Sequence, residues 1–129
     1  MAINTTPIHT KAPELGPVSI ATANANLDGT GTIGTAYTAG ADGAFVHRIW
    51  MKAIVTTTAG MLRVFVYDGA AYWLIHEEPV AANTKSATVP AWETVWECRM
   101  RLEASHSIRV STEKAETFHV TVEAESLTS

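Results

Sequence analysis

The 129-residue sequence is the size of one domain, and a chain of this length buries roughly two-thirds of the surface that it exposes when unfolded. The formal net charge is -4 and the nine Lys and Arg residues are scattered, so we expect no nucleic-acid partner. The sequence lacks a signal peptide and has no run of about 18 apolar residues, so we expect a protein that is made in the cytoplasm and has no membrane partner.

Three prolines interrupt residues 1–17, which are otherwise mostly polar, and this composition disfavours a sheet ladder and favours extended backbone. We expect this segment to be an extended N-terminal arm, either disordered or docked along a neighbouring subunit. Residues 18–129 are expected to form a single β-sandwich domain that begins with a short strand over residues 18–23.

Residues 24–35, NANLDGTGTIGT, partly match a calcium-binding loop, because Asn and Asp residues occupy positions one, three and five and Gly29 occupies position six. The match fails at position twelve, where Thr35 stands in place of the bidentate Glu. We favour a turn-rich connection, in which Asn and Asp side chains hydrogen-bond the nearby backbone and the glycines adopt positive φ. A strand over residues 32–39 is expected to follow.

Residues 45–80 contain three apolar, β-branched and aromatic runs separated by two turn signals, a pattern that predicts a three-stranded meander. In the first run, alternation places five residues inward: Phe45, Ile49, Met51, Ala53 and Val55. In the second run, the inward residues are Leu62, Val64 and Val66.

A polar loop over residues 81–92 is expected to cross between sheets. Residues 95–103 alternate regularly, which predicts one strand with inward Trp96, Cys98, Met100 and Leu102. Cys98 is the only cysteine, and we expect it to be a small buried apolar residue rather than a reactive thiol. Two further strands are expected over residues 108–111 and 118–124, the second with inward Phe118, Val120, Val122 and Ala124.

About eight short strands bounded by Gly, Pro, Asn and Asp, without helical periodicity, predict an all-β fold with an antiparallel β-sandwich. A jelly roll is the favoured architecture. An immunoglobulin-like sandwich is the alternative, although the Cys and Trp spacing of true immunoglobulin domains is missing.

The sequence shows no clear catalytic pattern, so we expect a protein that is not an enzyme and has no catalytic residues, no cofactor and no bound metal. Strand pairing could bring His47, His76 and His119 together as a zinc site, but their spacing gives no support for one. Glu77 and Glu78 are adjacent in a predicted strand, so they point to opposite faces and cannot act as a paired acid and base.

Six residues of the central stretch are predicted to form an interface, because alternation places them away from the core: Arg48, Trp50, Lys52, Arg63, Phe65 and Tyr67. Aromatic area flanked by arginine is typical of protein interfaces. Hydrophobic residues make up 47% of the chain and charged residues only 17%, which also favours self-association. The alternative is that loops and the N-terminal arm cover these side chains within one subunit.

Four short patterns within residues 20–125 carry a family resemblance: DGTGT at 28–32, TAGADG at 38–43, TTTAGM at 56–61 and R-x-F-x-x-D-G at 63–69. With them, the chain resembles small jelly-roll structural proteins of tailed bacteriophages. The resemblance implies a capsid decoration (cement) protein on the virion surface. Its implied partners are the major capsid protein and further copies of itself, as a homotrimer.

Two other functions share these sequence features. A module of the phage tail, baseplate or fibre would show the same turn and strand patterns. A carbohydrate-binding module would use Trp50, Tyr72 or Trp73 as a platform on which a sugar ring stacks.

Overall fold

The structure, a computed structural model, describes residues 9–128, with side chains described for residues 12–127. This part of the chain contains nine strands and no helix, and so no helix that could cross a membrane. The strands are β1 (His9–Ile20), β2 (Gly34–Thr38), β3 (Ala44–Ala53), β4 (Gly60–Tyr67), β5 (Tyr72–Val80), β6 (Glu93–Trp96), β7 (Met100–Leu102), β8 (Ser107–Thr112) and β9 (Phe118–Thr128).

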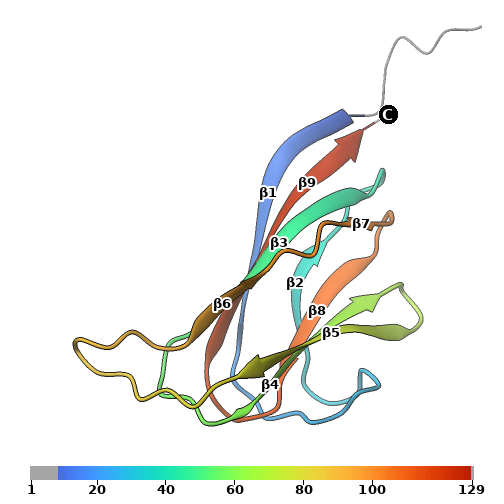
Figure 1. The fold of residues 1–129 in the computed structure, drawn as a ribbon. Coiled ribbons are helices and arrows are strands. Elements are labelled where there is room, and N and C mark those ends of the chain that lie inside the picture. Colours follow the sequence, from blue (N-terminus) through green and yellow to red (C-terminus); the bar gives the residue numbers. More distant parts are fainter. Residues whose placement is uncertain (1–8, 129) are drawn as a thin grey trace, which may run out of the picture.

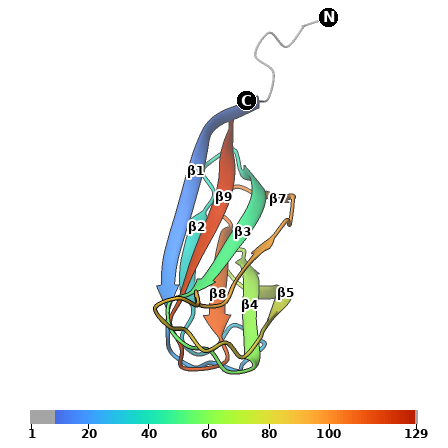
Figure 2. The ribbon, with the colours of Figure 1, turned by 60° about the vertical axis from the view of Figure 1, so that its left-hand side comes forward.

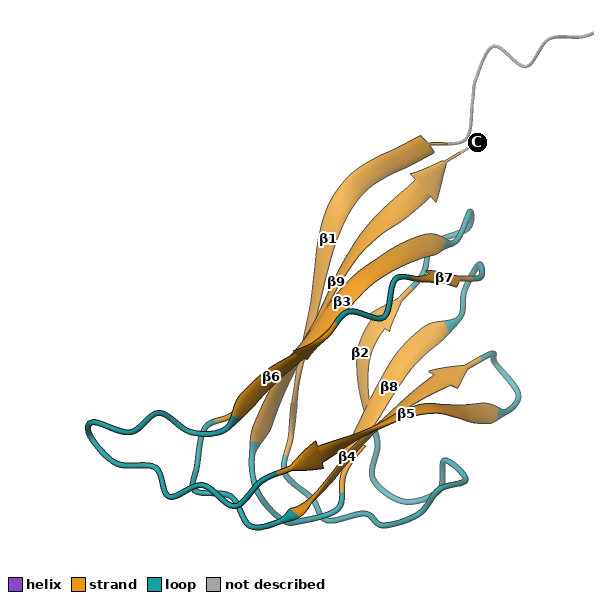
Figure 3. Ribbon diagram, viewed as in Figure 1, coloured by secondary structure: helices purple, strands orange, loops and turns teal. Residues whose placement is uncertain are grey.

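The strands form two antiparallel sheets that face each other (Figure 1, Figure 3). Sheet A has the order β1-β9-β3-β6, with β7 also paired to β3, and sheet B has the order β2-β8-β4-β5. If β6 and β7 count as one interrupted strand, the first strand pairs with the last, the second with the next to last, and so on inward. A long hairpin folded over in this way is a jelly roll, which confirms the predicted fold class.

The central stretch is not the predicted meander. Strand β3 lies in sheet A, whereas β4 and β5 form a hairpin in sheet B. The chain crosses between the sheets at residues 54–59, where Thr57 forms an isolated antiparallel bridge with Asn83. The prediction was wrong because alternation identifies a strand and its inward face, but it does not identify the strand's partners.

The core lies between the sheets and consists mainly of the side chains that alternation places inward. In β9 these are at most 1% exposed: Phe118, Val120, Val122 and Ala124. In β3, Ile49, Met51 and Ala53 are buried as predicted, but Phe45 is not, because a bulge at His47 reverses the alternation. Val55 is also exposed. Each buried aliphatic side chain contributes about 1.5–3 kcal/mol by area alone.

The predicted N-terminal arm is largely a strand, so its boundary at residue 17 was wrong. Residues 9–17 belong to β1 and pair with β9, while residues 1–8 lie outside the described part of the chain. β1 is an edge strand, and an edge strand tolerates Pro13 and Pro17 because one side of its backbone needs no ladder partner. β1 is also tied to sheet B, since the Tyr37 hydroxyl donates a hydrogen bond of 2.6 Å to Glu14 Oε1.

The predicted strand over residues 95–103 is interrupted opposite the β3 bulge. Arg99 has a positive φ of 46°, which breaks the strand into β6 and β7, and its backbone N–H donates to the His47 carbonyl at 3.2 Å. The inward face is otherwise as predicted. Cys98 packs against the core and its thiol donates to the Val46 carbonyl, while burial raises the pKa of that thiol.

The loop between β1 and β2 packs against the outer face of sheet B. Its Asn and Asp side chains bond the local backbone as predicted: Asn24 Nδ2 donates to the carbonyls of Thr30 and Thr32, and Asp28 Oδ1 accepts from the Thr30 N–H. Gly29 has a φ of 87°, and a Cβ at this position would overlap the Tyr72 ring. The loop therefore serves as a cover for sheet B.

Candidate docking face

The outer face of sheet A carries exposed apolar side chains that no other part of the described chain covers. Trp50 is 48% exposed, and it is in register with Thr121 on one side and Val95 on the other, while Thr121 pairs with Pro17. Leu15 lies two residues before Pro17 in β1, on the same face of the strand, and is 69% exposed. We call this surface the outer A face, and it is defined by Leu15, Pro17, Trp50 and Val95.

Ion pairs flank Trp50 on both sides along β3. Arg48 pairs with Glu123 of β9 and, at 3.2 Å, with Glu97. Hydrogen bonding to Glu97, with the charges of both carboxylates, raises the pKa of Arg48 above its ordinary value. Lys52 Nζ lies 3.2 Å from Glu93 and also donates to the Ala91 carbonyl. The apolar stripe is therefore bordered by charges that are largely neutralised within the sheet.

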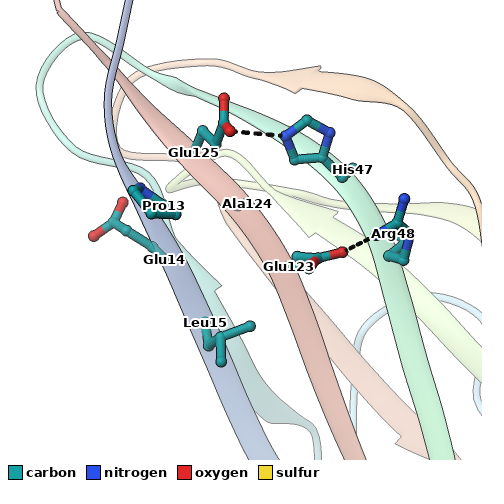
Figure 4. A pocket seen from close by; sticks show the side chains of 8 residues that line it. All are labelled: Pro13, Glu14, Leu15, His47, Arg48, Glu123, Ala124 and Glu125. Atoms are coloured by element: carbon teal, nitrogen blue, oxygen red, sulfur yellow. Dashed lines mark hydrogen bonds and ion pairs between the residues drawn. The ribbon is translucent and has the colours of Figure 1, made fainter.

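A groove of about 570 Å³ lies beside this stripe, at the β3 bulge (Figure 4). Its lining comes from β1, β3 and β9 and combines apolar and charged side chains: Pro13, Glu14, Leu15, His47, Arg48, Glu123, Ala124 and Glu125. Within it, His47 Nε2 lies 3.4 Å from a Glu125 oxygen. The groove makes this part of the outer A face concave.

The six predicted interface residues do not form one surface. Arg48, Trp50 and Lys52 lie on the outer A face, as predicted for an exposed face, but the other three belong to sheet B. Phe65 is 0% exposed and Arg63 only 7% exposed, so neither can offer contact area to a partner. The prediction was wrong for these two because a strand pattern does not reveal which side chains pack on the outer side of the sheet: Glu77 and Glu113 pair with Arg63, and the Tyr72 ring packs edge-on against Phe65.

The covered residues instead stabilise sheet B. Arg63 Nη2 donates to Glu113 at 3.0 Å, and its Nε lies 3.5 Å from Glu77. Tyr67 packs on Tyr72 with ring centroids 4.4 Å apart, and the Arg109 guanidinium lies 4.3 Å from the Tyr67 ring centre. These contacts all lie within one chain. They agree, for the three sheet B residues of the predicted interface, with the alternative that such side chains are covered within one subunit.

A second exposed apolar group lies at the β5 edge of sheet B. Trp73 is 58% exposed and Ile75, an extra residue at a register shift between β4 and β5, is 37% exposed. The Trp73 indole N–H donates to Asp68 Oδ2 at 2.9 Å, which fixes the ring. A shallow groove of about 290 Å³ runs along this edge, lined by Leu74, Ile75, His76 and Glu77.

The three histidines considered for zinc are not brought together. His76 lies in sheet B and bonds Glu78 at 2.9 Å, whereas His47 and His119 lie in sheet A. Within residues 9–128, no group of three or more His, Cys, Asp and Glu side chains is placed to hold a metal ion. Glu77 and Glu78 face opposite sides of β5, as predicted, toward Arg63 and His76 respectively.

Sequence reasoning missed two members of the outer A face. Leu15 was hidden in the segment that was assigned to an arm. Val95 stands beside Glu93 and Glu97 on the polar side of an alternating run, and an apolar residue in that position was the signal that could have revealed it.

Comparison with known proteins adds little to this description. No family model and no curated protein matches the sequence. Among solved structures, the chain is similar to one from the T13 IBDV viral particle, with 11% identity over 98% of this chain and a TM-score of 0.43. Chains from the Gx and Gt strains of infectious bursal disease virus give 11% and 12% identity over 98% of this chain, with TM-scores of 0.39 and 0.36.

This chain spans only about a third of the length of those chains, 35% to 37%. The class of the protein, a jelly-roll β-sandwich, follows from its own strand order.

Proposed function

We propose that this protein is a structural component of a bacteriophage virion, a decoration protein that binds the outside of the head as a homotrimer and stabilises contacts between major capsid subunits. The observation that carries the proposal is the uncovered apolar stripe of Leu15, Pro17, Trp50 and Val95 across sheet A. Exposed apolar area of this kind, bordered by paired charges, is typical of a protein interface.

Two further observations support this proposal. The jelly roll is an architecture that viral capsid domains use, although lectin domains and cupins use it too, so the fold alone does not decide the function. The phage-like turn patterns lie where they shape the surface loops and turns, as with Gly29 and Gly31 in the loop over sheet B and Gly69 in the β4–β5 turn.

Binding rather than catalysis fits the charged groups of the outer A face. Arg48 and Lys52 form ion pairs with Glu93, Glu97 and Glu123. These cations and carboxylates therefore orient and neutralise one another. A general acid or base must itself face the bound substrate in order to donate a proton to it or accept one from it. We therefore propose that the protein is not an enzyme.

Trp73 favours a second candidate, a carbohydrate-binding module of the tail or fibre. Its ring is exposed and held in one orientation by Asp68, as a stacking platform requires. Tyr72 suits this role less well, because Gly29 packs on its ring and Arg109 bonds its hydroxyl.

The experiment that tests the proposal is sedimentation of the purified protein with heads and, separately, with tails of a phage that encodes it. We expect the wild type to sediment with heads and Trp50→Asp to remain in solution. Val89→Asp places the same charge at an exposed apolar residue of the β5–β6 loop and is the matched control, expected to bind as the wild type does. Binding to tails alone, or to a glycan array through Trp73, would favour the second candidate.

A further inference from the structure

The groove at the β3 bulge contains a carboxylate that no described lysine or arginine side chain balances. Glu125, whose side chain is 32% exposed, lies 3.4 Å from His47, which is charged only when it is protonated. Arg101 lies two strands from Glu125 in the same row of the sheet, but it pairs with Glu103 at 3.5 Å. Among the side chains of residues 12–127, no other ion pair reaches Glu125. Its charge is therefore available to a partner.

The neighbouring carboxylates leave the groove negatively charged. Arg48 pairs with both Glu97 and Glu123, so one guanidinium serves two carboxylates. Glu123 and Glu125 are two residues apart in β9, so their side chains rise on the same face about 7 Å apart. The third carboxylate of the lining, Glu14, points away from these two in Figure 4 and accepts the Tyr37 hydroxyl.

The groove also has an apolar side. It is lined by β1, β9 and β3, which Figure 2 shows side by side. Pro13 and Leu15 of β1 supply the apolar side chains, and Leu15 also belongs to the outer A face. A volume of about 570 Å³ lies within the range of ligand pockets, about 300 to 1,000 Å³, and leaves room for one long side chain.

We propose that this groove binds an arginine side chain of the partner protein, beside the apolar contact that the partner makes with Trp50. The methylene stem of that arginine lies along Pro13 and Leu15, and its guanidinium faces Glu125 and Glu123. This inference rests on the proposed function and adds the chemistry of the partner's surface, which is apolar with one projecting arginine.

The chemistry of the groove favours arginine over lysine. A guanidinium carries five N–H donors in one plane, so it can bond two carboxylates on the same strand face. It is also less strongly hydrated than an ammonium group, which suits a site from which docking removes water. Its stem is apolar and packs well against residues such as Leu15.

Docking on the outer A face makes the missing cation important. A partner that covers Leu15 and Trp50 also removes water from the groove, and a carboxylate that loses its water without gaining a counter-charge is destabilised. Arg48 and Lys52 already have carboxylate partners, so they need no charge from outside. Glu125 lacks such a partner, so this position discriminates against surfaces that offer no cation.

The test is a titration of the isotope-labelled protein with two blocked dipeptides, followed by the backbone amide NMR signals of Leu15, His47 and Glu125. Acetyl-Leu-Arg-amide is expected to shift these signals in a saturable manner. Acetyl-Leu-citrulline-amide has nearly the same shape without the charge, and it is expected to bind several times more weakly. Equal binding of the two peptides, or no saturable shift with either, would overturn the inference.

A pair of variants locates the site. Glu125→Gln removes the carboxylate charge of the groove and should weaken binding of the arginine peptide to the level of the citrulline peptide. Glu103→Gln removes the same charge from an exposed position outside the groove and should bind as the wild type does. A Glu125→Gln protein that keeps the wild-type Tm and the wild-type affinity contradicts the assignment. Equally tight binding of acetyl-Leu-Lys-amide contradicts the choice of a guanidinium.

Sedimentation with heads separates this inference from the proposed function. We expect Glu125→Gln to bind heads about tenfold more weakly than Glu103→Gln does. If the wild type binds heads and Glu125→Gln binds them equally well, the inference fails and the proposed function stands. If the wild type does not bind heads, the proposed function fails, and the peptide titration still decides whether the groove binds arginine.

Discussion

The imidazole of His76 in β5 lies flat against the indole of Trp96 in β6, with ring centroids 3.9 Å apart and planes inclined by 7°. β5 is an edge strand of sheet B and β6 an edge strand of sheet A, so this stack connects the two sheets where the sandwich would otherwise be open. Glu78 holds the imidazole from within β5 at 2.9 Å.

This stack predicts energetic coupling across the sheets. In a double-mutant cycle with His76→Ala and Trp96→Ala, we expect a coupling free energy of about 0.5–1.5 kcal/mol, measured by urea denaturation. The combination of His76→Ala with Trp50→Ala, whose side chain lies on the opposite face of sheet A, is the control and should be additive. Additivity of the first pair would mean that the stack does not hold the sheets together.

Alanine substitutions at three glycines distinguish the cost of backbone strain from the cost of steric overlap. At Gly29, φ is positive and a Cβ would overlap Tyr72, so Gly29→Ala combines both effects and should cost more than about 2 kcal/mol of unfolding free energy. Gly69 has positive φ but open space, so its Ala variant should cost about 1–2 kcal/mol. Gly40 has neither feature, and Gly40→Ala should change stability by less than about 0.5 kcal/mol.

Thermal unfolding of the three variants checks this order. Equal losses for Gly29→Ala and Gly69→Ala would show that the loop over sheet B moves away from Tyr72 without cost. The loop would then not be a firm cover for that sheet.

Asp68 makes part of the stability dependent on pH. The indole N–H of Trp73, followed by the backbone N–H groups of Ala71 and Ala70, lowers the pKa of Asp68 from 3.8 to about 2. Because the pKa is depressed in the folded state, the stabilisation is complete above the ordinary pKa and is lost as pH falls toward about 2. We expect the difference in Tm between wild type and Asp68→Asn to be constant near neutral pH and to shrink between about pH 4 and pH 2. If the difference for Asp68→Asn were as large at pH 2 as at pH 7, its cause would be something other than the carboxylate charge.

Removal of residues 1–17 should unfold the protein or lower its Tm severely. An arm could be removed at little cost, but residues 9–17 form most of β1, so the truncation leaves β9 as a bare edge strand and removes the bond from Tyr37 to Glu14. Leu15→Lys keeps the strand and changes only a side chain that is 69% exposed, so it should leave Tm nearly unchanged. A truncated protein as stable as the wild type would restore the interpretation of residues 1–17 as an arm.

The alternation of apolar and polar residues predicted the strands well, but it did not predict which other segments pack around them. The inward residues of β9 were predictable because burial on one face imposes alternation of apolar and polar side chains. The break at Arg99 was not, because it depends on the bulge at His47 in another strand. The segment that holds Pro13 and Pro17 could be identified as a strand only from its place at the edge of the sheet.

The candidate site was half predictable for the same reason. Trp50 faces away from the core, as its alternation with Ile49 and Met51 predicted. Phe65 also alternates outward from Val64, yet it is buried, because the Tyr72 ring packs edge-on against it and Gly29, in a loop distant in sequence, lies against that ring. Exposure is thus a property of the assembled fold, and strand pattern supplies only the direction of each side chain.

The folded-over arrangement has a consequence for how the chain reaches its native state. In sheet A, β9 lies between β1 and β3, and His9 pairs with Thr128 at the far end of the described chain. β1 therefore has no ladder partner in its own sheet until β9 has been synthesised, so sheet A cannot be completed before the last strand is made, although β3 can already pair with β6 and β7. Pairing over such sequence distances makes folding slow, and until β9 docks one edge of β3 remains unpaired and open to aggregation.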